Sequence, residues 1–115
     1  VITDGLNLNP VVVISAHSSS WYGLPFALYN PTRIKAYVAL SPLSQSHHLD
    51  SDYESAKFKT LIARGERDVR AAIAAKKLKL MQKVEDMVIP NVDYAFYFDD
   101  PQLWVPRMLE FLNDL

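Results

Sequence analysis

Short apolar runs alternate along this chain with stretches in which apolar residues recur at helical spacing. The runs that are rich in β-branched residues predict strands at 11–15, 34–40, 60–64 and, more weakly and at a sheet edge, 84–89. The predicted helices are residues 21–29, 69–82 and 101–115. Strands that alternate with helices typically form a parallel sheet with right-handed crossovers. The order therefore predicts one α/β domain over residues 1–115, with about four parallel strands and flanking helices.

Three segments modify this outline. Residues 2–8 resemble the tail of a helix whose start is absent, so we expect an N-terminally truncated domain with uncovered apolar surface. Residues 42–52 are polar and predict a loop. In the last predicted helix, Asp99 or Asp100 could cap the start, and Pro106 predicts a kink or a late start.

Composition excludes several classes of function. The formal net charge is −1, from 12 basic and 13 acidic residues, which gives no electrostatic reason to expect a nucleic acid or an anionic membrane as partner. The one dense basic cluster, Lys76, Lys77 and Lys79, is interpreted as a solvated helix face. There is no cysteine, which excludes disulfides and a thiol nucleophile, and no apolar run is long enough to span a bilayer. We expect a cytoplasmic protein, and a nuclear location is also compatible.

The first predicted strand leads directly into small residues and then a helix. Residues 16–20 read Ala-His-Ser-Ser-Ser. A strand–turn–helix with small residues is where α/β-hydrolases place their nucleophile, usually as G-x-S-x-G, because residues two before and two after it must fit against the neighbouring strand. The size rule favours Ser18 as the nucleophile, and His17 is expected to shape the pocket.

Three further passages extend the resemblance over essentially the whole chain. Residues 22–26 read Tyr-Gly-Leu-Pro-Phe, residues 60–68 form an apolar strand followed by G-x-x-D, and residues 97–104 carry a Tyr-x-Asp-x-Pro-x-x-Trp pattern. Together they resemble the abhydrolase-domain-containing protein 14 family. The resemblance implies that the chain is the C-terminal half of an α/β-hydrolase fold, beginning in the helix before the nucleophile strand.

The resemblance also implies roles for individual residues. Counting back from residues 24–26 puts the nucleophile at Ser19, which we favour over Ser18, and the backbone N–H of Ser20 would then be an oxyanion donor. Asp68 would be the acid of the triad, and it is equally suited to cap the helix from residue 69.

The triad base is missing at its expected place. In this fold the base is a histidine that follows the acid, but His17, His47 and His48 all precede Asp68. The family's histidine falls on Tyr94, whose phenol is a weak base at neutral pH. A base supplied by His47 or His48, or a metal site formed by these two with Asp50 and Asp52, are alternatives; solvated loop histidines are the simpler interpretation.

Two functions follow from these expectations. One is a hydrolase of small acyl esters, or a deacetylase of acetyl-lysine, impaired by the loss of its base. The other is a non-catalytic pseudoenzyme that binds a ligand or a protein partner, or a truncated fragment. No cofactor and no metal are expected for either.

Overall fold

The computed structural model describes residues 10–45 and 48–115. The predicted helix tail at 2–8 and His47 lie outside these described residues.

The four predicted strands form one parallel sheet. They are β1 (Val11–Ala16), β2 (Ile34–Leu40), β3 (Lys59–Gly65) and β4 (Lys83–Ile89). Their order in the sheet is β1-β2-β3-β4, and every neighbouring pair is parallel, which confirms the predicted sheet and the edge position of β4. Because all four strands run in one direction, their carboxyl ends meet at one edge.

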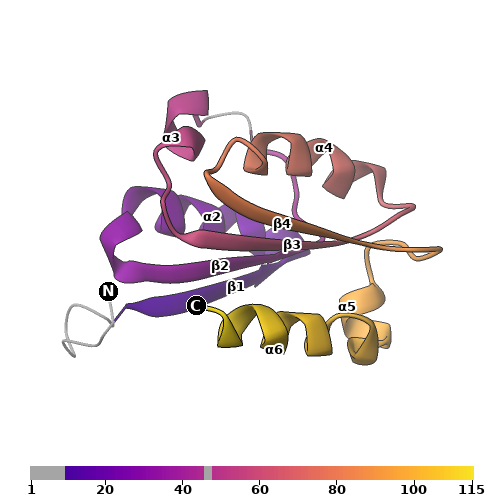
Figure 1. Ribbon diagram of the computed structural model, residues 1–115. Coiled ribbons are helices and arrows are strands. Elements are labelled where there is room, and N and C mark those ends of the chain that lie inside the picture. The colour runs from indigo at the N-terminus through magenta and orange to yellow at the C-terminus, as the bar shows by residue number, and fades with distance from the viewer. Residues whose placement is uncertain (1–9, 46–47) are drawn as a thin grey trace.

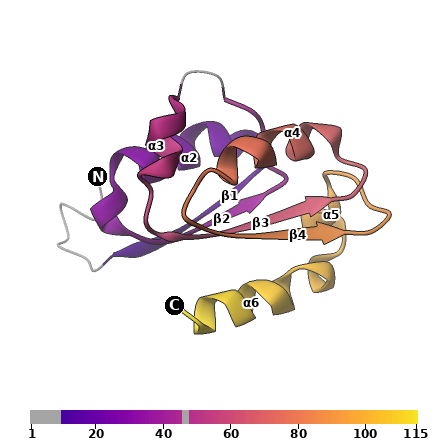
Figure 2. The same cartoon turned by 45° about the horizontal axis from the view of Figure 1, so that its top comes forward.

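Helices cover both faces of the sheet (Figure 1). On one face lie α2 (Ser20–Tyr29), α3 (Asp50–Glu54) and α4 (Val69–Leu78). On the other lie the short α5 (Phe96–Asp99) and the amphipathic α6 (Val105–Asn113), as the turned view in Figure 2 also shows. The 3₁₀ turns are η1 (His17–Ser19), η2 (Pro31–Arg33) and η3 (Pro101–Leu103).

The sequence-based boundaries need three corrections. The helix predicted to reach residue 82 ends at Leu78, and the loop predicted at 42–52 contains the start of α3. The last predicted helix is divided, and its main part begins late with Pro106 in the first turn, where the missing N–H costs nothing. Neither Asp99 nor Asp100 caps α6, because Trp104 occupies that position.

Each face of the sheet has its own core. The first contains Tyr37 and Ile62 from the sheet, packed with Leu24, Leu28, Tyr53 and Leu78 from the helices. The second contains Val38 and Leu61, packed with Phe96 and Phe111. On this second face the β1 end is thinly covered: Ile14 stays 48% exposed although Val12 and Ala16 beside it pack against the core. Apolar surface is therefore left open at the β1 edge, as the sequence predicted.

Candidate functional site

The turn after β1 has an unusual backbone. β1 ends at Ala16, and the next residue, His17, has a φ of 49° before the chain enters η1 and α2. A positive φ is uncommon for a residue other than glycine. His17 is thus the apex of the strand-to-helix turn, and its side chain is presented at the carboxyl edge of the sheet.

Close packing of α2 on β1 explains why this turn is so tight. A Cβ on Gly23 would come within 2.8 Å of the Ser15 Cβ, so the helix can lie this close to the strand only with glycine there. Ser15 is buried, and its hydroxyl shares a 2.6 Å hydrogen bond with the Tyr37 hydroxyl on β2. Burial raises the pKa of Tyr37 to about 12, even though the hydrogen bond with Ser15 acts in the opposite direction.

The three serines after the apex hold the turn in place. Ser19 Oγ accepts from Ala16 N–H and donates to the Ala16 carbonyl, both at 2.7 Å. The Ser20 hydroxyl donates to the His17 carbonyl at 2.7 Å and accepts from the Leu43 N–H at 3.2 Å. Ser18, like Ser19, is exposed. The hydroxyls of Ser19 and Ser20 are therefore engaged with the backbone of the turn and of the loop after β2.

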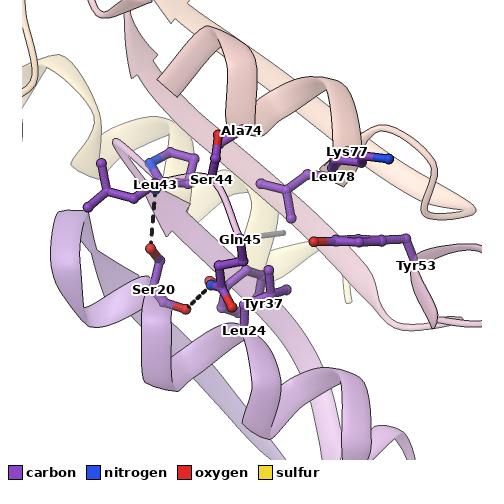
Figure 3. Close-up of a pocket in the computed structure, with 11 residues that line it drawn as sticks. Ser20, Leu24, Tyr37, Leu43, Ser44, Gln45, Tyr53, Ala74, Lys77 and Leu78 are labelled. Atoms are coloured by element: carbon purple, nitrogen blue, oxygen red, sulfur yellow. Dashed lines mark hydrogen bonds between the residues drawn. The ribbon is translucent and has the colours of Figure 1, made fainter. Parts of the chain in front are cut away.

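A small cavity lies below this turn, between α2, the loop after β2 and α4 (Figure 3). Ser20 and Gln45 face each other across it, and the Gln45 side chain donates to the Ser20 carbonyl. Its volume, about 10 Å³, is close to the minimum for one water molecule. This cavity has no room for a substrate.

Asp68 stands at the end of β3 as the sequence predicted. It is the N-cap of α4, where its carboxylate accepts from the Ala71 N–H at 3.1 Å, and it is buried, with 9% of its surface exposed. The capping role is confirmed. The carboxylate lies in the pocket described below, so both predicted roles remain geometrically open to it.

Gly65 allows the loop after β4 to approach Asp68. A Cβ at Gly65 would overlap the carbonyl oxygens of Val92 and Asp93. The Arg67 N–H donates to the Val92 carbonyl at 3.0 Å. The glycine in the G-x-x-D pattern is therefore needed for a close approach of two backbones, and this approach brings Tyr94 to the site.

The loop is also tied to the end of β2. Ser41 is fully buried, has a φ of 46° and donates from its hydroxyl to the Tyr94 carbonyl at 2.9 Å. Three strand ends thus fix the position of Tyr94: β2 through Ser41, β3 through Gly65, and β4, from which the loop itself continues.

These elements enclose an open pocket of about 440 Å³ at the carboxyl edge of the sheet. Its lining residues are His17, Arg67, Asp68, Val69, Arg70, Asp93 and Tyr94. The rings of His17 and Tyr94 stack with centroids 4.8 Å apart and an interplanar angle of 24°. The Nδ1 atom of His17 is buried and has no hydrogen-bond partner among the described residues. Imidazole, phenol and carboxylate therefore meet in one pocket.

The structure brings together only some of the residues predicted from the sequence. Asp68 and Tyr94 line the same pocket, whereas Ser18 and Ser19 are not among its lining residues. His17, predicted only to shape the pocket, stands at the apex of the turn. The sequence signal that could have pointed to the apex is the pair of small residues, Ser15 and Ser19, two positions before and after it.

His48 differs from its sequence-based interpretation as a solvated loop residue. It is buried, with Nδ1 2.8 Å from the Tyr29 hydroxyl and Nε2 2.7 Å from the Gln45 Oε1. Its ring is used in packing α2 against the segment before α3, and it is not part of the pocket lining around Asp68. Asp50 pairs with Lys77, and Asp52 accepts from the Leu49 N–H.

No group of three His, Cys, Asp or Glu residues within the described part of the chain is arranged to hold a metal ion. Within the same residues no helix combines the length and apolar character needed to cross a membrane.

Solved structures with the same fold are α/β hydrolases and esterases. A CIB-like hydrolase from Thermoplasma acidophilum matches with a TM-score of 0.84 and 17% identity, covering 99% of this chain and 56% of that one. The carboxylesterase CesB from Bacillus subtilis matches with a TM-score of 0.76 and 14% identity, covering 96% of this chain and 62% of that one. The fold is therefore that of an α/β hydrolase, of which this chain forms part.

Curated proteins with similar sequences extend over nearly the whole chain. No family model matches the chain. The putative protein-lysine deacylase ABHD14B from Rattus norvegicus is 30% identical over 114 residues, which is 99% of this chain and 54% of that relative. Protein ABHD14A from the same organism is 26% identical over 111 residues, which is 96% of this chain and 46% of that relative. Over nearly its whole length the chain is similar in sequence to these abhydrolase-domain-containing protein 14 relatives. It spans about half the length of the curated relatives it matches.

Proposed function

We propose that this chain is a catalytically impaired member of its family, which keeps the pocket of a hydrolase for binding and does not hydrolyse esters or amides through an activated serine. The observation that carries this proposal is the stack of Tyr94 on His17 beside Asp68. A serine nucleophile needs a base within hydrogen-bond reach, and the base in turn needs the acid. The residue beside Asp68 that should be this base carries a phenol.

The two candidate serines support the same conclusion. Ser19 is bonded through its hydroxyl to both backbone groups of Ala16, and Ser18 is exposed. Neither hydroxyl has a hydrogen bond to an imidazole in the described residues. Loss of one triad member typically lowers the rate by several orders of magnitude.

The ligand class that we propose comes from the relatives. One of them is described as a putative protein-lysine deacylase, so acetyl-lysine or a small acyl ester is the first ligand to test. Two arginines and two aspartates, Arg67, Arg70, Asp68 and Asp93, line the pocket, and this balance of formal charges suits a neutral polar group such as an amide better than a free ion. A protein that carries acetyl-lysine would be the corresponding partner.

A fluorophosphonate probe tests the proposal directly, since it forms an adduct only with an activated serine. We expect no adduct by intact mass on the folded chain over hours at pH 7.5. An adduct that disappears in Ser18→Ala or in Ser19→Ala would identify an activated serine, favour an active hydrolase or deacylase, and contradict the proposal. Binding is measured separately, by chemical-shift changes at Tyr94 on titration with Nε-acetyl-lysine and with lysine as the control.

A further inference from the structure

We infer that His17, and neither Ser18 nor Ser19, occupies the nucleophile position of this fold, so that the hydroxyl and the imidazole have exchanged places between the turn and the loop after β4. The inference deepens the proposed function and depends on the same pocket. In a working triad the turn presents a hydroxyl and the loop presents an imidazole. Here the turn presents the imidazole of His17 and the loop presents the hydroxyl of Tyr94.

Backbone geometry is the first observation for this assignment. The nucleophile of an α/β hydrolase sits on a sharp, strained strand-to-helix turn. Of the residues between Ala16 and α2, His17 is the one with a positive φ, at 49°. Ser19 already has helical backbone angles, with φ −69° and ψ −12°. The apex is therefore one residue before Ser18 and two before Ser19.

Steric fit is the second observation. The positions two before and two after the apex must be small to fit beside the neighbouring strand. With His17 at the apex these positions are Ser15, buried against Tyr37, and Ser19, folded back onto Ala16. With Ser19 at the apex they would be His17 and Trp21, two of the larger side chains. With Ser18 they would be Ala16 and Ser20, which are also small, so size rules out Ser19 and the backbone angles separate His17 from Ser18.

Position in the pocket is the third observation. His17 lines the same pocket as Asp68 and Tyr94, and its ring is in contact with the Tyr94 ring. Its Nδ1 atom is buried without a hydrogen-bond partner among the described residues. An uncommon backbone conformation and a buried, unpaired polar atom in one residue are both typical of functional sites.

The exchange explains why the pocket is inactive although its chemical groups are those of a triad. Stacked rings put the phenol oxygen above or beside the imidazole, whereas proton transfer needs the hydroxyl in the plane of the ring at hydrogen-bond distance. No hydrogen bond joins His17 to Tyr94 in the described structure; the contact between them is the ring stack. The pair therefore forms a flat wall of the pocket.

Single-thiol variants test the assignment, because the chain has no cysteine of its own. We would make His17→Cys, Ser18→Cys and Ser19→Cys, each with and without Tyr94→His, and measure alkylation by iodoacetamide at pH 6.5 by intact mass. A thiol beside an imidazole has a lowered pKa and reacts as the thiolate. Of the three cysteine variants, we expect only His17→Cys to be alkylated faster, about tenfold, when Tyr94→His is added. This figure allows for the lower nucleophilicity of a thiolate of low pKa.

The outcomes are decisive in either direction. A rate increase at Ser18→Cys or Ser19→Cys, or none at all in folded His17→Cys/Tyr94→His, would overturn the assignment. If that double variant does not fold by circular dichroism, His17→Ser/Tyr94→His takes its place, with a fluorophosphonate adduct at position 17 as the expected result and its absence as the overturning one. The proposed function fails separately, through an adduct on the unmodified chain.

Discussion

At Gly65, a single missing Cβ determines whether the pocket can form. A methyl group there would overlap the carbonyl oxygens of Val92 and Asp93, which belong to the backbone and cannot rotate away as a side chain would. We expect Gly65→Ala to reduce the free energy of unfolding by about 1–3 kcal/mol, the range for overpacked interiors, and to displace Tyr94. Urea unfolding measures the first effect, and the ring-current shifts that Tyr94 imposes on His17 measure the second.

Gly23→Ala is the matched control for this prediction. Its Cβ would meet the Ser15 side chain at 2.8 Å, on the other side of the sheet edge, and the substitution also gains about 1 kcal/mol of helix propensity. We expect it to shift α2 and the turn with His17, and so to alter the His17–Tyr94 stack, but to leave unchanged the amide shift of Arg67, which donates to the Val92 carbonyl beside Gly65. If Gly65→Ala retained both the stability and the shifts, the close approach of the two backbones would not be what places Tyr94.

Between elements, a partly buried carboxylate, Asp86 on β4, pairs with Arg64 on β3 and with Lys79 just after α4. Arg64 donates to both carboxylate oxygens of Asp86, and Lys79 lies 2.9 Å from one of them. Burial alone would raise the pKa of Asp86, but the hydrogen bonds and the positive charges of Arg64 and Lys79 together hold it below its usual value. This carboxylate therefore stabilises the fold in its ionised form.

The lowered pKa of Asp86 determines how the effect of Asp86→Asn on stability changes with pH. A lowered folded-state pKa contributes stability above the unfolded pKa, about 4, and this contribution is lost as the pH falls through the folded value. We expect Asp86→Asn to cost about 1.5–3 kcal/mol at pH 7, measured by urea unfolding, and the difference from the unmodified chain to shrink as the pH falls below about 4.

Glu85→Gln provides the comparison for Asp86→Asn on the same strand. Its partner Arg107 and Glu85 itself are both substantially exposed, so we expect a cost below about 1 kcal/mol at any pH. If the two substitutions lowered the free energy of unfolding equally, the partly buried position of Asp86 would not make its ion pairs more stabilising than the exposed pair of Glu85.

Taken as a whole, the sheet was predictable from the sequence, and the apex of the turn was not. The runs at β1 to β3 are mainly apolar on both faces because helices cover both, whereas β4 is partly charged and lies at an edge; both patterns are visible in the sequence. Asp68 and Tyr94 were singled out by the resemblance, through the G-x-x-D pattern after β3 and the position of the family's histidine, and the structure places both in one pocket. His17 was missed because serine is the expected nucleophile, and a positive φ leaves no signal in a residue other than glycine. His48 was misjudged because its partners, Tyr29 and Gln45, are brought together only by the fold.

The whole molecule should lose stability at alkaline pH through its buried phenols. Burial raises the pKa of Tyr37, which is fully enclosed in the first core, to about 12, and burial likewise raises that of Tyr53 to about 12. A raised folded-state pKa means that stability is fully present below the unfolded pKa, near 10, and is lost as the pH rises toward 12. For Tyr37 the loss approaches a limit on the order of 3 kcal/mol.

Tyr37→Phe separates this titration from other alkaline effects. At pH 7 we expect the variant to be about 1 kcal/mol less stable, because the Ser15 hydroxyl loses its partner in a buried position. Above pH 10 its stability should fall less steeply than that of the unmodified chain, with Tyr53 accounting for part of the remaining slope, so the two curves of unfolding free energy against pH converge. Parallel curves between pH 10 and 11.5 would mean that the Tyr37 phenol ionises equally well in the folded and unfolded chain, and that the first core is open to water beneath the turn that carries His17.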